Sequence, residues 1–165
     1  MGHARLEKQE VFMENQRTQG AFEFLHTLVN QPLCYGLKST DMDLYEFGFG
    51  TCEELSEESG QSRMICTLYL HVTCRFKIMW KNGTSWVDRY HADTPCRKFH
   101  ADIKKLIGLV VKRIELSDKN DLWLDFGDYW VVFATFENGE ESWRFFTSDN
   151  SKPHLVASDL KLFFA

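Results

Sequence analysis

The residues with the clearest potential for chemistry are a histidine, a cysteine and a second histidine in one short stretch. His91, Cys96 and His100 are separated by four and by three residues. Imidazole nitrogens and thiolates bind zinc, and Cys96 and His100 would share one face of a helix. The same helix would direct Cys96 into the core beside apolar neighbours, and this packing role is the favoured interpretation. We keep the three residues as metal-site candidates but predict no metal and no cofactor.

The sequence contains no pattern that assigns a catalytic residue. No cysteine lies in a papain-type signature, and no serine lies in a nucleophile elbow. Asp125 and Asp128 flank a glycine, and Asp41 and Asp43 flank a methionine. Aspartates at such positions are typical of turns, where they bond their own backbone. The chain also lacks a glycine-rich phosphate loop. We therefore leave enzymatic activity open and favour a non-enzymatic role.

Aromatic residues form the first group that could bind a partner. Trp123, Tyr129 and Trp143 lie in the stretch 121–146, which the alternation of apolar residues predicts as three strands. Aromatic side chains are enriched both in protein cores and at interfaces. The sequence leaves open whether these rings fill a core or contact a partner.

An acidic run supplies the second group. It contains four carboxylates: Glu53, Glu54, Glu57 and Glu58. Residues 51–63 are small and polar, so we expect an exposed loop there. Such a run would speed association with a basic partner, such as a toxin nuclease.

Length and composition limit the class of protein. The chain has 165 residues, of which 44% are hydrophobic, and these values suit one soluble domain with one core. The net charge of −5 disfavours nucleic acid as a partner, because binding to phosphates rests on lysine and arginine. No apolar run is long enough to span a membrane, and the N-terminus lacks a signal-peptide pattern. We therefore expect a cytoplasmic protein whose five cysteines are free.

The periodicity predicts two helices and many strands. Residues 17–30 and a stretch beginning at Pro95 read as helices, the second with Thr94 as its N-cap. Asn-Gly pairs at 82–83 and 138–139 predict hairpin turns. We expect an α+β fold in which two helices pack on a strongly bent antiparallel sheet or a partly open barrel. Residues 1–16 would be a mobile tail and 17–165 a single domain, with pseudo-repeats at 17–93 and 94–165.

Several motifs resemble those of a group of uncharacterised bacterial proteins. They are Leu106-Ile107-Gly108, Leu122-Trp123-Leu124-Asp125-Phe126-Gly127 and Glu141-Ser142-Trp143-Arg144-Phe145, followed by a closing segment at 146–156. Several such small acidic proteins look like immunity proteins of bacterial toxin systems. The resemblance implies a protein-binding role and no catalytic residues.

The leading hypothesis is a non-enzymatic protein-binding module, such as an immunity protein whose partner is a toxin. A homodimeric module is another. The alternative is a small-molecule-binding or enzymatic domain with a pocket inside the bent sheet. In that case His71, Arg75 or Trp130 would line the pocket.

Overall fold

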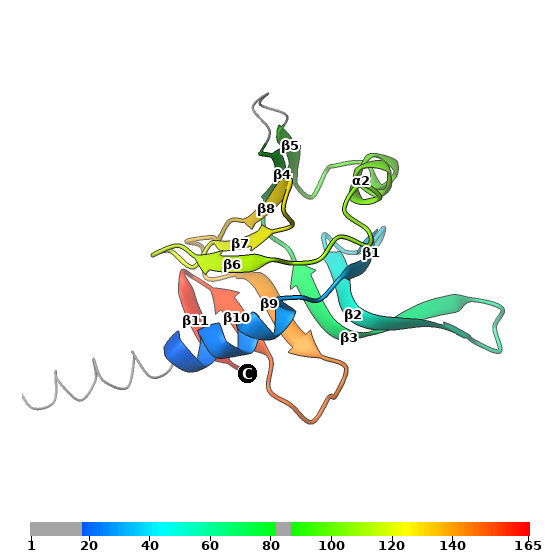
Figure 1. Cartoon of the computed structure of the whole chain (residues 1–165), viewed down its shortest axis with the longest axis horizontal. Coiled ribbons are helices and arrows are strands. Elements are labelled where there is room, and N and C mark those ends of the chain that lie inside the picture. The colour runs from blue at the N-terminus through cyan, green and yellow to red at the C-terminus, as the bar shows by residue number, and fades with distance from the viewer. Residues whose placement is uncertain (1–17, 82–86) are drawn as a thin grey trace, which may run out of the picture.

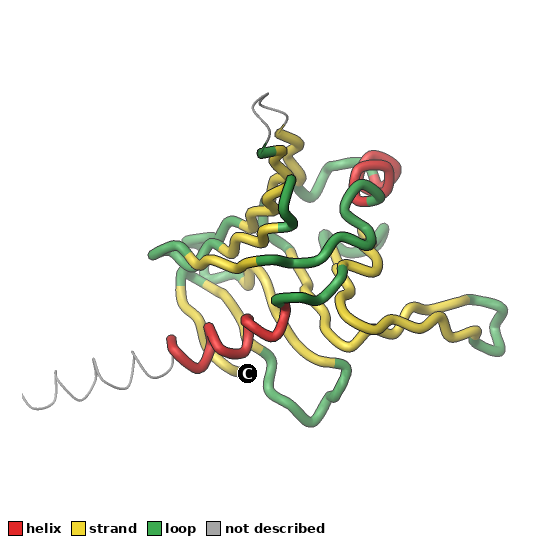
Figure 2. The backbone as a smooth tube through the Cα atoms, in the orientation of Figure 1, coloured by secondary structure: helices red, strands yellow, loops and turns green. Residues whose placement is uncertain are grey.

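The computed structural model describes residues 18–81 and 87–165, and it consists of two antiparallel sheets with two short helices (Figures 1 and 2). The predicted tail at 1–16 and the Asn82-Gly83 turn lie outside the described residues. The predicted α+β class with antiparallel strands is confirmed. The finer prediction of two helices on one bent sheet or open barrel holds only in part, because the described strands divide between two sheets and these do not close into a barrel.

The larger sheet has six strands in the order β1-β2-β3-β9-β10-β11. Every neighbouring pair is antiparallel. The strands are β1 (Leu33–Lys38), β2 (Tyr45–Ser56), β3 (Ser62–Val72), β9 (Glu141–Thr147), β10 (Leu155–Ser158) and β11 (Lys161–Phe164).

The smaller sheet has five strands in the order β5-β4-β8-β7-β6, again antiparallel. Its strands are β4 (Phe76–Trp80), β5 (Val87–Tyr90), β6 (Arg113–Leu116), β7 (Leu122–Asp125) and β8 (Tyr129–Phe133). Strands β8 and β9 belong to different sheets, so the prediction of a hairpin at Asn138-Gly139 is wrong. That segment carries the chain from one sheet to the other.

Each half of the chain gives strands to both sheets. The first half supplies β1–β3 to the larger sheet and the β4–β5 pair to the smaller one. The second half supplies β6–β8 to the smaller sheet and β9–β11 to the larger one. The order β1-β2-β3-β9-β10 therefore parallels the order β6-β7-β8-β4-β5. This arrangement agrees with the pseudo-repeats 17–93 and 94–165, which stay a prediction.

Residues 18–25 form the first helix, which continues into the short 3-10 helix η1 (His26–Leu28). Its buried side chains include Ala21, Leu25 and Leu28. Phe24 packs on Phe145 of β9, with ring centroids 4.9 Å apart. The helix therefore lies against the β9–β11 end of the larger sheet (Figure 1).

The second helix, α2 (Cys96–Ile103), packs on β1. Gly36 of β1 permits this close approach, since a Cβ there would lie 2.6 Å from Cγ1 of Ile103. Thr94 is not the N-cap, because its hydroxyl accepts a hydrogen bond from the His91 N–H instead. The buried Lys38 holds the turn before α2 by donating to the carbonyl of Thr94 at 2.6 Å.

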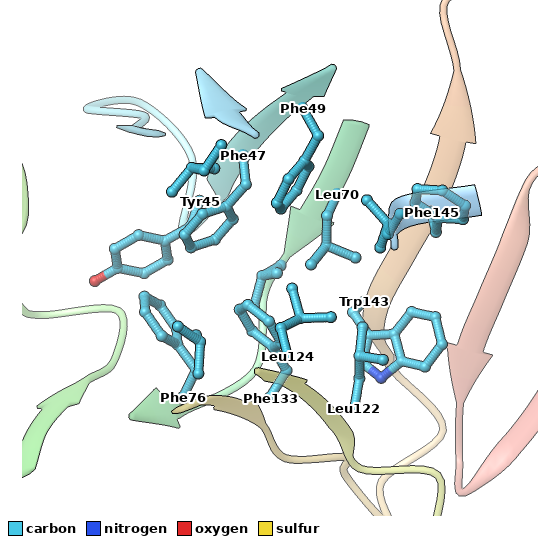
Figure 3. Packing of buried hydrophobic residues seen from close by; sticks show 14 of the residues in the cluster. Tyr45, Phe47, Phe49, Leu70, Phe76, Leu122, Leu124, Phe133, Trp143 and Phe145 are labelled. Atoms are coloured by element: carbon cyan, nitrogen blue, oxygen red, sulfur yellow. The ribbon is translucent and has the colours of Figure 1, made fainter. Parts of the chain in front are cut away.

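One aromatic core joins the two sheets (Figure 3). The ring of Phe47 in β2 lies 5.6 Å from Phe76 in β4 and 5.4 Å from Phe133 in β8, both edge to face. Phe99 of α2 packs in the same way on Tyr45, 4.9 Å away. Edge-to-face contacts are a favoured geometry for aromatic rings and add to the stability gained from burial.

The acidic stretch at 51–63 is not a loop. Strand β2 continues to Ser56 and β3 begins at Ser62, and the ladder between them reaches from Cys52↔Cys66 to Ser56↔Ser62. The sequence pattern of residues 51–63 does not reveal these strands, because most of its residues are polar and exposed and show no apolar alternation.

The contrast between two tryptophans tests the position of the core. Trp143 is 0% exposed and its Nε1–H donates to the Asn120 carbonyl, whereas Trp80 is 45% exposed. We expect Trp143→Ala to lower the free energy of unfolding by about 3–5 kcal/mol, because it leaves a cavity. The control Trp80→Ala should lose about 1 kcal/mol, the value of one stacked ring pair. Urea unfolding followed by circular dichroism measures both, and equal losses would contradict this placement of the core.

Candidate functional site

The acidic residues lie on a projecting part of the molecule. The far end of the β2–β3 hairpin extends away from both sheets and both helices (Figure 1). All four predicted carboxylates are exposed there: Glu53, Glu54, Glu57 and Glu58. We name residues 51–63 the acidic hairpin.

Paired strands hold the acidic hairpin in shape. The turn at its tip is closed by a hydrogen bond from the Glu57 N–H to the Gln61 carbonyl, 2.7 Å long. Glu53 pairs with Ile65 and Glu54 with Met64 across the ladder. Because neighbouring residues on a strand point to opposite faces, carboxylates are presented on both faces of the ribbon.

Aromatic and basic side chains gather on the outer face of the smaller sheet. Trp123 and Trp130 meet edge to face with their ring centroids 5.8 Å apart. The ammonium of Lys81 lies 4.3 Å from the Trp130 ring, and the Arg113 guanidinium lies 5.2 Å from it. Such cation–π contacts fix the rings in place. We name the set Trp123, Trp130, Lys81 and Arg113 the aromatic face.

Asp125 shares this face and neutralises part of its charge. Its carboxylate accepts a hydrogen bond from Lys81 and lies 3.8 Å from Arg113. Burial alone would raise the pKa of Asp125, but the bonds from Lys81 and from the Gly127 N–H hold it below its usual value. The carboxylate therefore stays ionised and bonded to the sheet.

The three aromatic candidates of the sequence divide between the surface and the core. Trp123 is half-buried on the aromatic face. Tyr129 is half-buried and stacks on the exposed Trp80, with centroids 6.2 Å apart. Trp143 is fully buried and therefore belongs to the core, so it presents no surface to a partner.

A carboxylate–imidazole pair lies on the outer face of the larger sheet. Glu46 of β2 bonds to His71 of β3, with 2.5 Å between Oε2 and Nε2. The other carboxylate oxygen accepts the hydroxyl of Tyr35 in β1. Sequence reasoning missed this set, since its members are up to 36 positions apart and only the strand register, which pairs Glu46 with His71, brings them together.

The electrostatics of this set indicate a structural tie between strands. The bond to His71 is the main cause that lowers the pKa of Glu46, and burial opposes it. Burial and the bond to Glu46 raise the pKa of the Tyr35 hydroxyl. Both oxygens of Glu46 and Nε2 of His71 are occupied by bonds within the sheet. The arrangement therefore fastens β1, β2 and β3 together across their outer face.

The proposed ligand triplet His91, Cys96 and His100 does not come together as a metal site. The described residues contain one group of three side chains close enough to hold a metal ion, and it consists of other residues. Cys96 directs its thiol to the Lys38 carbonyl, and His100 packs beside Phe99. Cys96 and His100 are both half-buried, whereas Phe99 and Ile103 are the buried side chains of α2.

The cysteines differ from the prediction. Cys52 and Cys66 form a disulfide across the β2–β3 ladder, so the prediction that all five cysteines are free is wrong for this pair. Cys34, Cys74 and Cys96 are free thiols. The pairing was not visible in the sequence because the two residues are 14 positions apart, and only the strand register places them opposite each other.

The space between the sheets is too small for a ligand. The hollow there has an empty volume of about 170 Å³, is lined only by apolar side chains and does not admit a water molecule. The predicted lining residues are elsewhere. His71 and Trp130 lie on outer faces, and Arg75 is exposed.

Comparison of the chain with models of protein families, with curated proteins and with solved structures gives no match. In the described part of the chain, every helix is too short or too polar to span a lipid bilayer.

The bonds that Glu46 makes to His71 and Tyr35 should make the free energy of unfolding depend on pH. We expect Glu46→Gln to lower the free energy of unfolding by about 1–2 kcal/mol at pH 7, since it removes a charged hydrogen-bond partner. The folded pKa of Glu46 lies below its ordinary value of 4.5. Its stabilisation is therefore present above pH 4.5 and is lost as the pH falls through the folded pKa. Urea unfolding at a series of pH values should show the difference between the two proteins shrinking below pH 4.5.

The matched control for this prediction is Glu54→Gln, which removes a carboxyl from the exposed acidic hairpin. We expect its effect at pH 7 to stay below about 0.5 kcal/mol. A difference between wild type and Glu46→Gln that stays constant down to the acid-unfolding range would contradict the electrostatic role of Glu46.

Proposed function

We propose that the protein is a non-enzymatic protein-binding module that docks a basic partner on its acidic hairpin. Its most concrete form is a cytoplasmic immunity protein of a bacterial toxin system, with the toxin as the partner. The observation that carries the proposal is the position of Glu53, Glu54, Glu57 and Glu58, which are all exposed on one projecting ribbon.

The charge of the acidic hairpin supports this role. Four glutamates and one arginine give residues 51–63 a net charge of −3, against −5 for the whole chain. A concentrated negative charge on a projection steers a basic protein toward productive encounters and repels acidic competitors. The ladder that continues to Ser56 and Ser62 restricts the hairpin before binding, which lowers the entropy cost of ordering it in a complex.

The filled interior argues against the alternative of a ligand pocket between the sheets. Small-molecule sites are usually clefts of several hundred Å³ with a few convergent polar groups. The hollow between the sheets is far smaller than that and has an apolar lining. The carboxylate–imidazole pair Glu46–His71 and the acidic hairpin lie outside this hollow, on the outer surface.

The aromatic face offers a second area for contact with the same partner or with another copy of the chain. Tryptophan, tyrosine and arginine are the residue types most enriched in the energetic centres of interfaces. Trp123 and Trp130 are half-buried and retain exposed surface beside Arg113. This face would add apolar contact after the acidic hairpin has oriented the partner.

Charge variants used as bait in lysate of the source organism test the proposal. The first bait is the wild-type protein, which should retain a basic protein at low salt and release it as salt rises. The second carries Glu53→Gln, Glu54→Gln, Glu57→Gln and Glu58→Gln. We expect at least about tenfold less retention by this variant, because exposed charges set the encounter with a basic partner. Quantitative mass spectrometry of the retained proteins gives the ratio.

A matched control removes four exposed carboxylates that lie elsewhere: Asp43→Asn, Asp118→Asn, Asp128→Asn and Glu137→Gln. It changes the net charge by the same amount and should retain the partner nearly as well as wild type. Equal loss of partner retention with both quadruple variants would mean that the total charge of the protein, and not the acidic hairpin, attracts the partner. Recovery of no basic protein at any salt would contradict the proposal itself.

A further inference from the structure

Three sulfur atoms from three neighbouring strands lie together on the larger sheet. They belong to Cys34 of β1, Cys52 of β2 and Cys66 of β3, and all three Sγ atoms lie within 4.8 Å of one another. The other two cysteines, Cys74 and Cys96, are separate free thiols. We name the set of three the thiol cluster.

Irregularities in the strands direct these side chains toward each other. The register between β1 and β2 shifts between Leu33 and Tyr35, so Cys34 has no partner in the ladder. The register between β2 and β3 shifts between Phe49 and Cys52. An extra residue at such a bulge re-aims the side chains around it. The third sulfur of the cluster therefore comes from a residue that the bulge has freed from regular pairing.

The backbone around the cluster leaves space for sulfur. Gly48 has no side chain, and a Cβ there would lie 2.6 Å from Sγ of Cys66 and 2.2 Å from Cε1 of Tyr35. The Cys34 thiol donates to the carbonyl of Gly50 at 2.9 Å, which holds its sulfur on the side of the Cys52–Cys66 bond. Cys66 is buried, whereas Cys34 and Cys52 are half-buried and reachable from solvent.

We propose that Cys34, Cys52 and Cys66 form a binding site for a soft divalent cation of the Zn²⁺ type when the Cys52–Cys66 disulfide is reduced. Reduction by a dithiol or by two monothiols breaks the S–S bond, transfers two electrons and two protons to Cys52 and Cys66, and leaves the reductant as its disulfide. Binding of the cation then replaces the three thiol protons, which pass to solvent. A reducing cytoplasm supplies such thiols.

The donor set decides the class of ion. Thiolates are soft ligands that select Zn²⁺ and Cu⁺ over Mg²⁺ and Ca²⁺. No fourth histidine, cysteine or carboxylate in the described part of the chain belongs to the group. Three thiolates with Zn²⁺ carry a net charge of −1, and with Cu⁺ they carry −2. The smaller charge costs less to hold at a half-buried site, so Zn²⁺ is favoured, with water as its fourth ligand.

Oxidation and metal binding exclude each other at this site. In the disulfide form Cys52 and Cys66 have no thiolate to offer, and Cys34 remains alone. Reduction frees the sulfurs of Cys52 and Cys66 to join that of Cys34, and the backbone ladder that pairs Cys52 with Cys66 stays in place. The cluster would thus hold the base of the acidic hairpin by a disulfide under oxidising conditions and by a metal ion under reducing conditions.

Titration with Cd²⁺ and Zn²⁺ tests the site directly. The purified full chain is reduced with a phosphine, freed of metal and titrated with Cd²⁺, whose thiolate bonds produce a charge-transfer absorption in the ultraviolet. We expect saturation at one Cd²⁺ per chain and displacement of that signal by Zn²⁺. Before reduction, the same protein should show at least about tenfold weaker binding, because two of the three ligands are missing.

Single substitutions locate the site. Cys34→Ser removes one ligand and leaves Cys52 and Cys66 able to pair, and Cys52→Ser provides a second variant should the first not fold. Each should weaken Cd²⁺ binding at least about tenfold. Loss of a residue that only orients a metal ligand already weakens metal binding by this much, and loss of the ligand itself should cost at least as much. Cys96→Ser, which removes a half-buried thiol outside the cluster, should bind Cd²⁺ as the wild type does. Unchanged binding by both folded cluster variants, or loss of binding in Cys96→Ser, would overturn the proposal.

Discussion

The edge-to-face contacts between Phe47 and its two partners, Phe76 and Phe133, are the interaction on which the rest of the structure depends. Each ring comes from a different strand, and the three strands belong to two different sheets. Phe99 places α2 against the same cluster. Because both halves of the chain contribute strands to both sheets, this core joins strands that are distant in sequence. A cavity here would loosen the sheets and α2 together.

A filled core moves the chemistry of the molecule to its outer surface. Polar groups cannot be buried without partners, and the polar side chains on the sheets bond to one another on the outer faces. Glu46 fastens three strands of the larger sheet through its bonds to His71 and Tyr35, and Asp125 bonds to Lys81 on the smaller sheet. The acidic hairpin differs from both, since its carboxylates are exposed and their charge is free to act on a partner. The thiol cluster lies where that hairpin joins the larger sheet.

Much of the fold could be predicted from local sequence patterns. The parts that could not be predicted depend on which strands pair with each other, and local patterns do not show this. The alternation of Leu122 and Leu124 predicts a strand, and the structure has β7 there. The fixed geometry of Pro95 predicts the start of a helix, and α2 begins at the next residue. The assignment of β8 and β9 to different sheets could not be predicted, because an Asn-Gly pair signals a turn but not which strand pairs next. The strand residues of the acidic hairpin show no apolar alternation, so their pairing could not be predicted from the sequence.

The candidate sites were harder to predict, because their members are distant in the chain. The acidic run was identified correctly as exposed, since its composition alone determines that. Trp143 and Trp123 are both strand residues, yet one is in the core and one on an outer face. The pairing of the strands then decides which distant residues meet. The disulfide between Cys52 and Cys66 and the bond between Glu46 and His71 depend on register in the same way.

Chemical labelling of carboxyl groups, read by mass spectrometry, tests the central claim most directly. The protein is labelled alone and in complex with the basic partner that it retains, and the modification of each acidic residue is compared. The account predicts that Glu53, Glu54, Glu57 and Glu58 lose labelling in the complex, while Asp118, an exposed residue outside the acidic hairpin, labels equally in both states. Unchanged labelling of the four glutamates in a stable complex would contradict the account.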